Sequence, residues 1–153
     1  MRRLIIFFAT GIYSGYAPIA PGTAGSVVGL VVIWFGFGPL WEHSPALCLT
    51  VFAIAFAIAC WISDRAEKIF DQHDDGRIVI DEVLGMAATM FGNPLTVPYL
   101  LLGFFLFRVA DVIKPWPASL IDRRMRNGAG VMLDDLAAAI YANIVLQVIV
   151  HVL

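Results

Sequence analysis

The sequence predicts an all-α, polytopic membrane protein, and three observations support that fold class. The mean hydropathy is +0.84, with 60% hydrophobic and only 14% charged residues, outside the range of soluble domains. Apolar runs long enough for membrane helices alternate with short polar turns. The 153 residues suffice for one domain, and no repeat or linker divides them. We therefore expect residues 1–153 to form a single membrane-embedded domain.

The first 26 residues are predicted to form a short helix followed by a shaped loop. Residues 4–13 are apolar but too short to cross about 30 Å of hydrocarbon, so we expect an interfacial or partly buried helix. Residues 15–26 contain Pro18, Pro21 and several glycines, which predicts a Pro/Gly-rich cytoplasmic loop. A helix should begin near Ser26, and the free N–H groups and hydroxyls of the loop would then face an anion.

Two membrane spans are predicted next. Residues 27–41 and 46–62 are apolar, and the polar turn at 42–45 joins them. Residues 63–77 carry most of the charge in the first half of the chain, and we expect an extended helix end followed by a solvated connector.

A helical hairpin is predicted in residues 83–107, although this stretch is long enough for one span. A single crossing would place the basic residues that follow on the opposite side from those that precede, against the positive-inside bias. Gly92-Asn93-Pro94 lies where a turn would fall. We therefore predict two short helices, 80–91 and 97–113, in a tilted or re-entrant hairpin.

The rest of the chain is predicted to form one further span. Residues 115–117 stop the preceding helix, residues 122–126 form a charged loop, and 127–130 turn the chain. A last helix should run from Met132 to Leu153, with Asp134 and Asp135 in its first turn, where the helix dipole favours anions.

Acidic pairs at the ends of apolar runs are the candidate chemical groups. Carboxylates are costly beside hydrocarbon, so they need a metal, a basic partner or water. The predicted topology gathers them on one side of the membrane, where oxygen-only ligands favour Mg²⁺. Neighbouring helical residues point about 100° apart, so each pair would offer one carboxylate to the site and one to a partner. The candidate metal ligands are Asp81, Glu82, Asp134 and Asp135.

Basic residues near these carboxylates predict an anionic ligand. Arg108, Asp111 and Lys114 follow one another at intervals of three near the end of a predicted helix. Arginine and lysine there would face a phosphate. Phosphoryl transfer at such a site would use a metal with a carboxylate-activated water or a carboxylate nucleophile.

Three other classes of protein were weighed. The net charge of −2 argues against a nucleic-acid partner. A small cation or solute carrier would use the same carboxylates. It would also require charged residues near mid-bilayer and a pseudo-symmetric repeat, and the sequence shows neither. An assembly factor with structural ion pairs would tolerate charge-preserving substitutions such as Asp81→Glu.

Four motifs resemble those of the phosphatidylglycerophosphatase A family, in that family's order and over nearly the whole chain. They are Ala20-Pro21-Gly22-Thr23 with Gly25-Ser26, residues 78–85 (IVIDEVLG), Phe107-Arg108-x-x-Asp111-x-x-Lys114-Pro115-Trp116-Pro117, and residues 130–135 (GVMLDD) with Ala138 and Tyr141. Ala110 and Ala139 depart from the family pattern at packing positions.

The resemblance implies a Mg²⁺-dependent, multi-pass phosphatase of the bacterial inner membrane with its active site on the cytoplasmic side. It would remove the terminal phosphate of phosphatidylglycerophosphate, a phospholipid in the bilayer, to give phosphatidylglycerol. With Ser26 added from the predicted loop, the expected substrate-binding residues are Thr23, Ser26, Arg108 and Lys114, and the expected catalytic residues are Asp81, Glu82, Asp111, Asp134 and Asp135.

Overall fold

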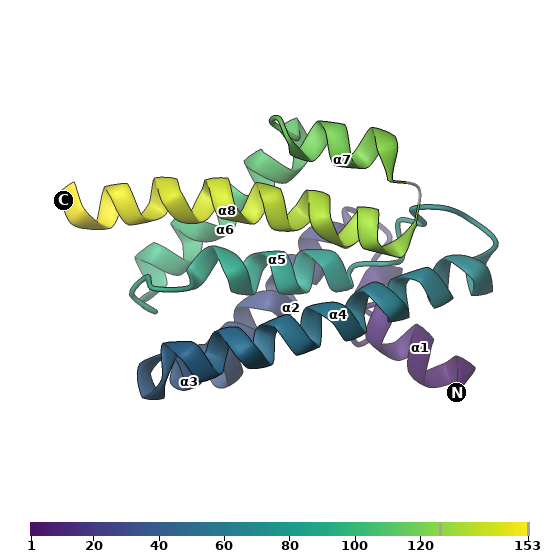
Figure 1. Cartoon of the computed structure of the whole chain (residues 1–153), viewed down its shortest axis with the longest axis horizontal. Helices are drawn as coiled ribbons and strands as arrows, with labels where there is room; N and C mark the ends of the chain where they lie inside the picture. Colours follow the sequence, from purple (N-terminus) through teal and green to yellow (C-terminus); the bar gives the residue numbers. More distant parts are fainter. Residues whose placement is uncertain (126, 153) are drawn as a thin grey trace.

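A computed structural model describes residues 1–125 and 127–152, which form a helical bundle without strands in those ranges (Figure 1). The all-α prediction is confirmed. The helices are α1 (Arg2–Ala9), α2 (Pro21–Val32), α3 (Gly38–His43), α4 (Pro45–Phe70), α5 (Ile80–Met90), α6 (Val97–Ile113), α7 (Ala118–Arg124) and α8 (Gly128–Val152), with a 3₁₀ turn at Ser14–Tyr16 and a π turn at Ile33–Phe37.

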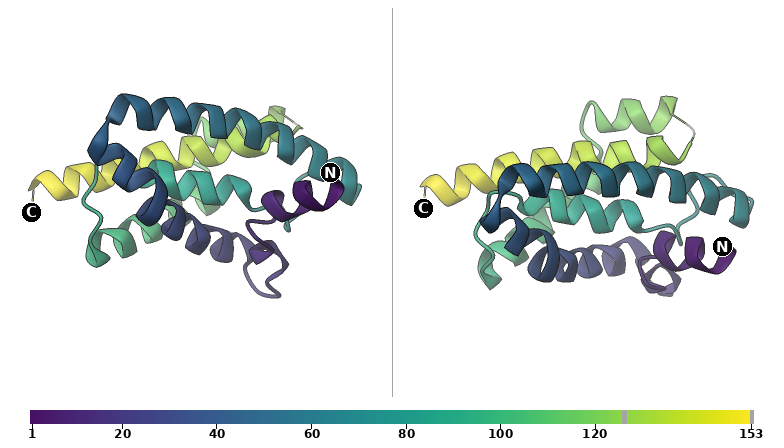
Figure 2. Two further views of the ribbon diagram at one scale, coloured as in Figure 1. Left: turned by 90° about the horizontal axis from the view of Figure 1, so that it is seen from below. Right: turned by 60° about the horizontal axis from the view of Figure 1, so that its bottom comes forward.

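Three helical segments are long and apolar enough to cross a membrane. They are Pro21–His43, in which α2, the π turn and α3 are continuous, Pro45–Phe70 and Gly128–Val152. Large apolar side chains such as Phe35 and Leu101 point outward, 78% and 61% exposed. An outer surface of this kind suits hydrocarbon. The long helices run roughly along one axis, and α7 packs on the outside of α8 (Figure 2).

The prediction of a loop over residues 15–26 is wrong beyond Ala20, because α2 begins at Pro21 and not near Ser26. Proline suits this first helical position, where its missing N–H would have no partner in any case. Ala20 takes a left-handed φ of 50°, which ends the loop sharply. Two of the glycines that suggested a loop, Gly22 and Gly25, lie inside α2, where they allow close packing against Glu82 and Val79.

Two further boundaries in the second half correct the prediction. Residues 118–124 form α7, where a charged loop was expected at 122–126, and Arg126 lies outside the described residues. The turn predicted at 127–130 is helical, because α8 begins at Gly128. A Cβ there would lie 2.2 Å from the Asp64 backbone nitrogen, so glycine allows α8 to start directly against α4. Asp134 and Asp135 consequently lie beyond the first turn of α8, and Leu153 is also outside the described residues.

The connector before α5 is anchored, whereas a solvated segment was expected. The Arg77 guanidinium donates hydrogen bonds of 2.7 and 2.6 Å to the two carboxylate oxygens of Asp75, which is buried. These bonds hold the pKa of Asp75 below its usual value. The Arg77 carbonyl also packs against Gly15, where a Cβ would lie only 2.1 Å away. The connector is therefore fixed to the segment between α1 and α2.

The predicted hairpin is present as α5 and α6. Residues 91–96 turn the chain, and α6 returns toward the end of the bundle at which α5 begins (Figure 1). Because α6 returns in this way, Arg108 on α6 lies close to the start of α5, with its Nη1 3.9 Å from Glu82 Oε1.

Helix α5 is the centre of the bundle, with eight of its eleven residues buried. It packs against α2, α4, α6 and α8. Glycines on α2 make the closest approach: a Cβ on Gly29 would lie 2.7 Å from Met86 Cβ and 2.8 Å from the Val83 carbonyl oxygen. Any larger residue would separate the two helices, so the glycines position α5.

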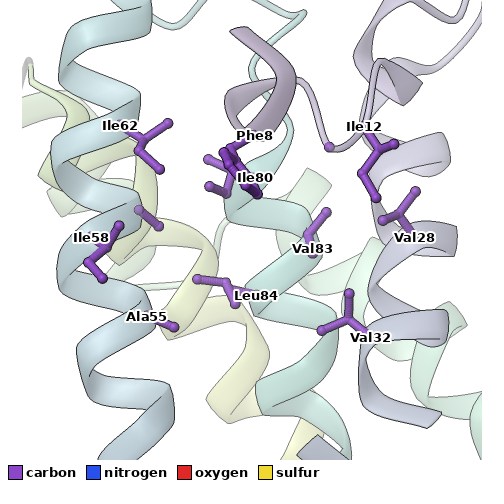
Figure 3. A pocket seen from close by; sticks show the side chains of 12 residues that line it. Phe8, Ile12, Val28, Val32, Ala55, Ile58, Ile62, Ile80, Val83 and Leu84 are labelled. Atoms are coloured by element: carbon purple, nitrogen blue, oxygen red, sulfur yellow. The ribbon is translucent and has the colours of Figure 1, made fainter. Parts of the chain in front are cut away.

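An apolar recess of about 390 Å³ lies on one side of α5. It is bounded by α2 and α4, floored by α5 and closed above by α1 (Figure 3). Ile80, Val83 and Leu84 contribute the α5 wall. Helical spacing places Asp81 and Glu82 on the other side of α5. The recess offers contact to hydrocarbon but no group for chemistry.

The arrangement of the helices indicates which loops lie on the same side of the membrane. Gln72 follows the end of α4, Arg124 ends α7 and His43 ends α3, and all three are exposed. The ends of α4 and α7 lie at the end of the bundle where α5 begins, and α3 lies at the opposite end (Figure 1). Single cysteines at positions 72 and 124, in a background with Cys48 and Cys60 replaced, should react with an impermeant thiol reagent from the same side. A cysteine at position 43 should react from the other side. Labelling of 72 and 124 from opposite sides would contradict the hairpin.

Candidate active site

Three carboxylates meet at one end of the bundle. Asp81 and Glu82 come from the first turn of α5, and Asp135 comes from α8. One oxygen from each lies within 4.8 Å of the other two. Asp81 and Asp135 are buried, and Glu82 is half-buried. Three negative groups so close together repel one another strongly unless a cation lies among them.

Each of these side chains also has an oxygen without a hydrogen-bond partner in the described part of the chain. These atoms are Asp81 Oδ1, Glu82 Oε2 and Asp135 Oδ2, all buried. A buried polar atom without a partner costs about 1–3 kcal/mol, and more when charged. Oxygen donors from three carboxylates are the ligands that a hard divalent cation prefers. The residues present therefore fit a metal ion.

Arg108 connects this cluster to α6 and α2. Its Nη1 lies 2.7 Å from Asp111 Oδ2 and 3.9 Å from Glu82 Oε1. Ser26 is buried on α2, with its Oγ 3.5 Å from the same nitrogen. Ser26 Oγ also donates to the Gly22 carbonyl at 3.0 Å. Asp111 thus orients a guanidinium that borders the carboxylates.

The first turn of α2 lies directly against the cluster. A Cβ on Gly22 would lie 2.1 Å from Glu82 Oε1 and 3.2 Å from Arg108 Nη1. Glycine leaves both side chains in place, whereas a larger residue would have to displace Glu82 or Arg108. Thr23, the next residue, is half-buried in the same turn.

Lys114 and Asp134 form a second group beside the first. Lys114 Nζ lies 2.8 Å from Asp122 on α7 and is also bonded to Asp134 on α8. Partial burial opposes its charge, but the hydrogen bonds to Asp122 and Asp134 outweigh this and raise the pKa of Lys114 above its usual value. The two neighbouring carboxylates therefore have different partners: Asp135 faces the cluster, and Asp134 binds Lys114.

The structure thus separates the predicted site residues by their surroundings. Asp81, Glu82 and Asp135 share one space, with Arg108, Asp111 and Ser26 at its border. Thr23 is in the adjoining turn, whereas Lys114 pairs with both Asp134 and Asp122. Sequence reasoning missed Asp122, which it assigned to a loop, and the packing role of Gly22 inside a recognised motif.

Fold and site together define a helical protein with membrane-length segments and a carboxylate-lined site at one end of its bundle. Residues 7–150 match the family Phosphatidylglycerophosphatase A, and the chain belongs to that family. The family resemblance is confirmed, and membership makes the chain a phosphoric monoester hydrolase.

Curated relatives cover most of the chain. Phosphatidylglycerophosphatase A of Haemophilus influenzae is 36% identical over 142 residues, 92% of this chain and 85% of the relative. Phosphatidylglycerophosphatase A of Escherichia coli is 34% identical over 146 residues, 94% and 81% of the two chains. A putative phosphatidylinositol-3-phosphatase of Bacteroides thetaiotaomicron is 33% identical over 153 residues, 95% and 92%. No solved structure matches this chain.

Gly22→Ala tests the closeness of α2 to the carboxylates. The added methyl group must displace Glu82 or Arg108, and overpacking of this kind costs about 1–3 kcal/mol. We expect phosphatase activity to fall at least tenfold, roughly 1.4 kcal/mol in the activation barrier, in protein that is still folded. Gly36→Ala is the matched control, because a Cβ there meets nothing within 4 Å. Equal activities of the two variants would contradict the packing.

Proposed function

We propose that this chain removes the terminal phosphate of phosphatidylglycerophosphate to give phosphatidylglycerol, with Mg²⁺ held by Asp81, Glu82 and Asp135. The carboxylate cluster carries the proposal, because its buried oxygens have no other partner among the described residues. The names of the Haemophilus influenzae and Escherichia coli relatives support the substrate. The reaction is hydrolysis: the phosphorus–oxygen bond of the ester breaks, water supplies the new oxygen, and the lipid hydroxyl takes up a proton.

The bound metal would neutralise phosphate charge and lower the pKa of a coordinated water. The protein side chains perform the remaining tasks. Arg108 offers a planar guanidinium that can contact two phosphate oxygens, and Asp111 holds it in place at 2.7 Å. The first turn of α2 borders the same space, and its N–H groups and the Thr23 hydroxyl would face the anion. Ser26, one turn further along α2, lies against Arg108 and helps to hold the guanidinium.

Lys114 and Asp134 are assigned to the edge of the site. Lys114 binds the carboxylates of Asp122 and Asp134, which largely compensate its positive charge. We propose that it fixes α7 and α8 against the end of α6 and adds weak attraction for the phosphate. Asp134, as its partner, supports the cluster from outside and need not touch the metal.

The site is proposed to face the cytoplasm of a bacterial cell. Basic residues gather at the end of the bundle where the carboxylates lie, which the positive-inside bias places on the cytoplasmic side. A phosphatase that acts on a lipid headgroup also needs its site at headgroup depth. Asp135 is the eighth residue of α8, about 10 Å from its start, which supports a site near the headgroups. The basic residues are Arg2, Arg3, Arg65, Lys68, Arg77, Arg123 and Arg124.

The carrier alternative is less well supported by this geometry. A carrier holds its ion near the bilayer midplane, between repeats that rock about it. Here the carboxylates lie at one end of the bundle and contact the start of α2.

Phosphate release from defined lipids tests the proposal. Purified protein in mixed micelles should release phosphate from phosphatidylglycerophosphate with Mg²⁺ and should lose this activity in EDTA. Phosphatidylinositol-3-phosphate is the comparison lipid suggested by the Bacteroides thetaiotaomicron relative. Glycerol-3-phosphate tests whether the lipid portion is needed. Preference for the inositol lipid would show that the proposed substrate is wrong. Full activity in EDTA would show that the reaction does not need a metal.

Substitution of single carboxylates tests the ligand assignment. Asp81→Asn, Glu82→Gln and Asp135→Asn each remove a charge and a donor oxygen, so we expect kcat/KM to fall about a hundredfold, roughly 2.7 kcal/mol. Asp134→Asn is the matched control on the same helix, and its loss should be smaller because its carboxylate contacts Lys114. If Asp134→Asn were the most damaging of the four, the metal ligands would have to be reassigned.

A further inference from the structure

The C-terminal end of α5 lies inside the bundle, and side-chain amides bind its last carbonyls. The final carbonyls of a helix have no partner within it, and in apolar surroundings they must find donors elsewhere. Asn143 on α8 supplies them: its Nδ2 lies 2.8 Å from the Thr89 oxygen, 2.8 Å from the Phe91 oxygen and 3.4 Å from the Ala88 oxygen. Asn143 therefore joins α8 to the end of α5.

Neighbouring amides reinforce this contact. Gln147 Nε2 donates to Asn143 Oδ1 at 3.0 Å and reaches the Phe91 oxygen at 3.4 Å. Asn93 Nδ2, from the turn after α5, lies 3.2 Å from the Thr89 oxygen. The Asn143 amide is thus held in one orientation.

The two contacts between α5 and α8 share one register. Asp135 meets Asp81 at the site, and Asn143 meets Thr89 at the far end of α5. In both pairs the α8 residue comes 54 positions later in the chain. The helices run parallel, and the contacts are separated by eight residues on each, about 12 Å of rise. A slip at one contact would therefore produce the same slip at the other.

Small residues make part of the apolar contact between these helices, which leaves part of their register to the polar contacts at its two ends. Gly85 on α5 and Ala138, Ala139 and Ala142 on α8 are buried, and such small residues make smooth surfaces. Between membrane helices there is also little hydrophobic driving force to favour one register. A slip of one residue would move a carboxylate about 1.5 Å, whereas site groups must be placed within about 0.5 Å.

We propose that Asn143 is a positioning residue that sets the register of α5 on α8, and so holds Asp81 and Glu82 at the distance from Asp135 that one cation requires. This inference rests on the proposed metal site. Asn143 does not touch the metal or the substrate; it acts through the carboxylates at the other end of α5.

Direct Mn²⁺ binding tests the inference. Full-length protein in detergent micelles is titrated with Mn²⁺, and the free ion is measured by electron paramagnetic resonance. Asn143→Leu keeps the side-chain size and removes the donors. Loss of a group that hydrogen-bonds directly to metal ligands typically weakens affinity by about 10- to 100-fold. Asn143 acts through the length of α5, so we expect a rise in Kd of about tenfold, the lower end of that range. Circular dichroism and gel filtration establish that the variant is folded.

Thr89→Val is the matched control in the same region. It removes a hydroxyl that donates to the Gly85 carbonyl at 3.0 Å within α5, but it leaves the Thr89 carbonyl that Asn143 binds. Its Kd for Mn²⁺ should equal that of wild type. Wild-type Kd in folded Asn143→Leu would overturn the inference, since the amide would then serve stability alone.

Two further variants complete the test. If Asn143→Leu does not fold, Gln147→Leu replaces it, because this variant removes the donor that orients Asn143. Weaker Mn²⁺ binding supports the inference and an unchanged Kd overturns it.

Asp135→Asn separates this inference from the proposed function. If Asp135→Asn binds Mn²⁺ as wild type does, the proposed metal site fails and the inference with it. If Asp135→Asn loses binding and folded Asn143→Leu retains it, only the register inference fails.

Discussion

Repulsion among three carboxylates, two buried and one half-buried, is the constraint on which the rest of the structure depends. Asp81, Glu82 and Asp135 have oxygens within 4.8 Å of one another inside a bundle whose core is mainly apolar. Two unit charges 4 Å apart repel by about 4 kcal/mol at the effective dielectric constant typical near a protein surface. The fold must therefore hold these groups together by other means. Glycine contacts, the Arg108–Asp111 pair and helix register all contribute.

Helix α5 shows how the constraint is met. It is too short to cross a bilayer, so both of its ends require partners inside the protein. At its start, α2 approaches closely enough for Gly22 to touch Glu82. At its end, Asn143 binds the last carbonyls. A full-length span would have placed its ends in water and left the carboxylates without fixed neighbours.

Much of this architecture could be predicted from sequence because it depends on local chemistry. The hairpin followed from Gly92-Asn93-Pro94 and from the distribution of basic residues, and the acidic pairs were visible as charges beside apolar runs. The start of α2 at Pro21 was missed although proline at a first helical position is a local signal, because the glycines that follow suggested a loop where they in fact mark close packing against α5.

Other features depend on tertiary contacts that the sequence does not reveal. Asp134 and Asp135 are equivalent by type and position, and only the location of Lys114 at the end of α6 divides them. Asn143 did leave a signal, since a polar amide inside an apolar helix usually has a specific partner. Its partner is a backbone carbonyl, which no residue pattern records.

The central claim is that a single site, formed by Asp81, Glu82 and Asp135, holds a divalent cation. Anomalous X-ray diffraction from crystals grown with Mn²⁺ in place of Mg²⁺ tests it most directly. The account predicts an anomalous peak among these three carboxylates, at about 2.0–2.2 Å from an oxygen of each, close to the distances of Mg²⁺ sites. A peak beside Asp134 and Asp122, with none among the three, would contradict it.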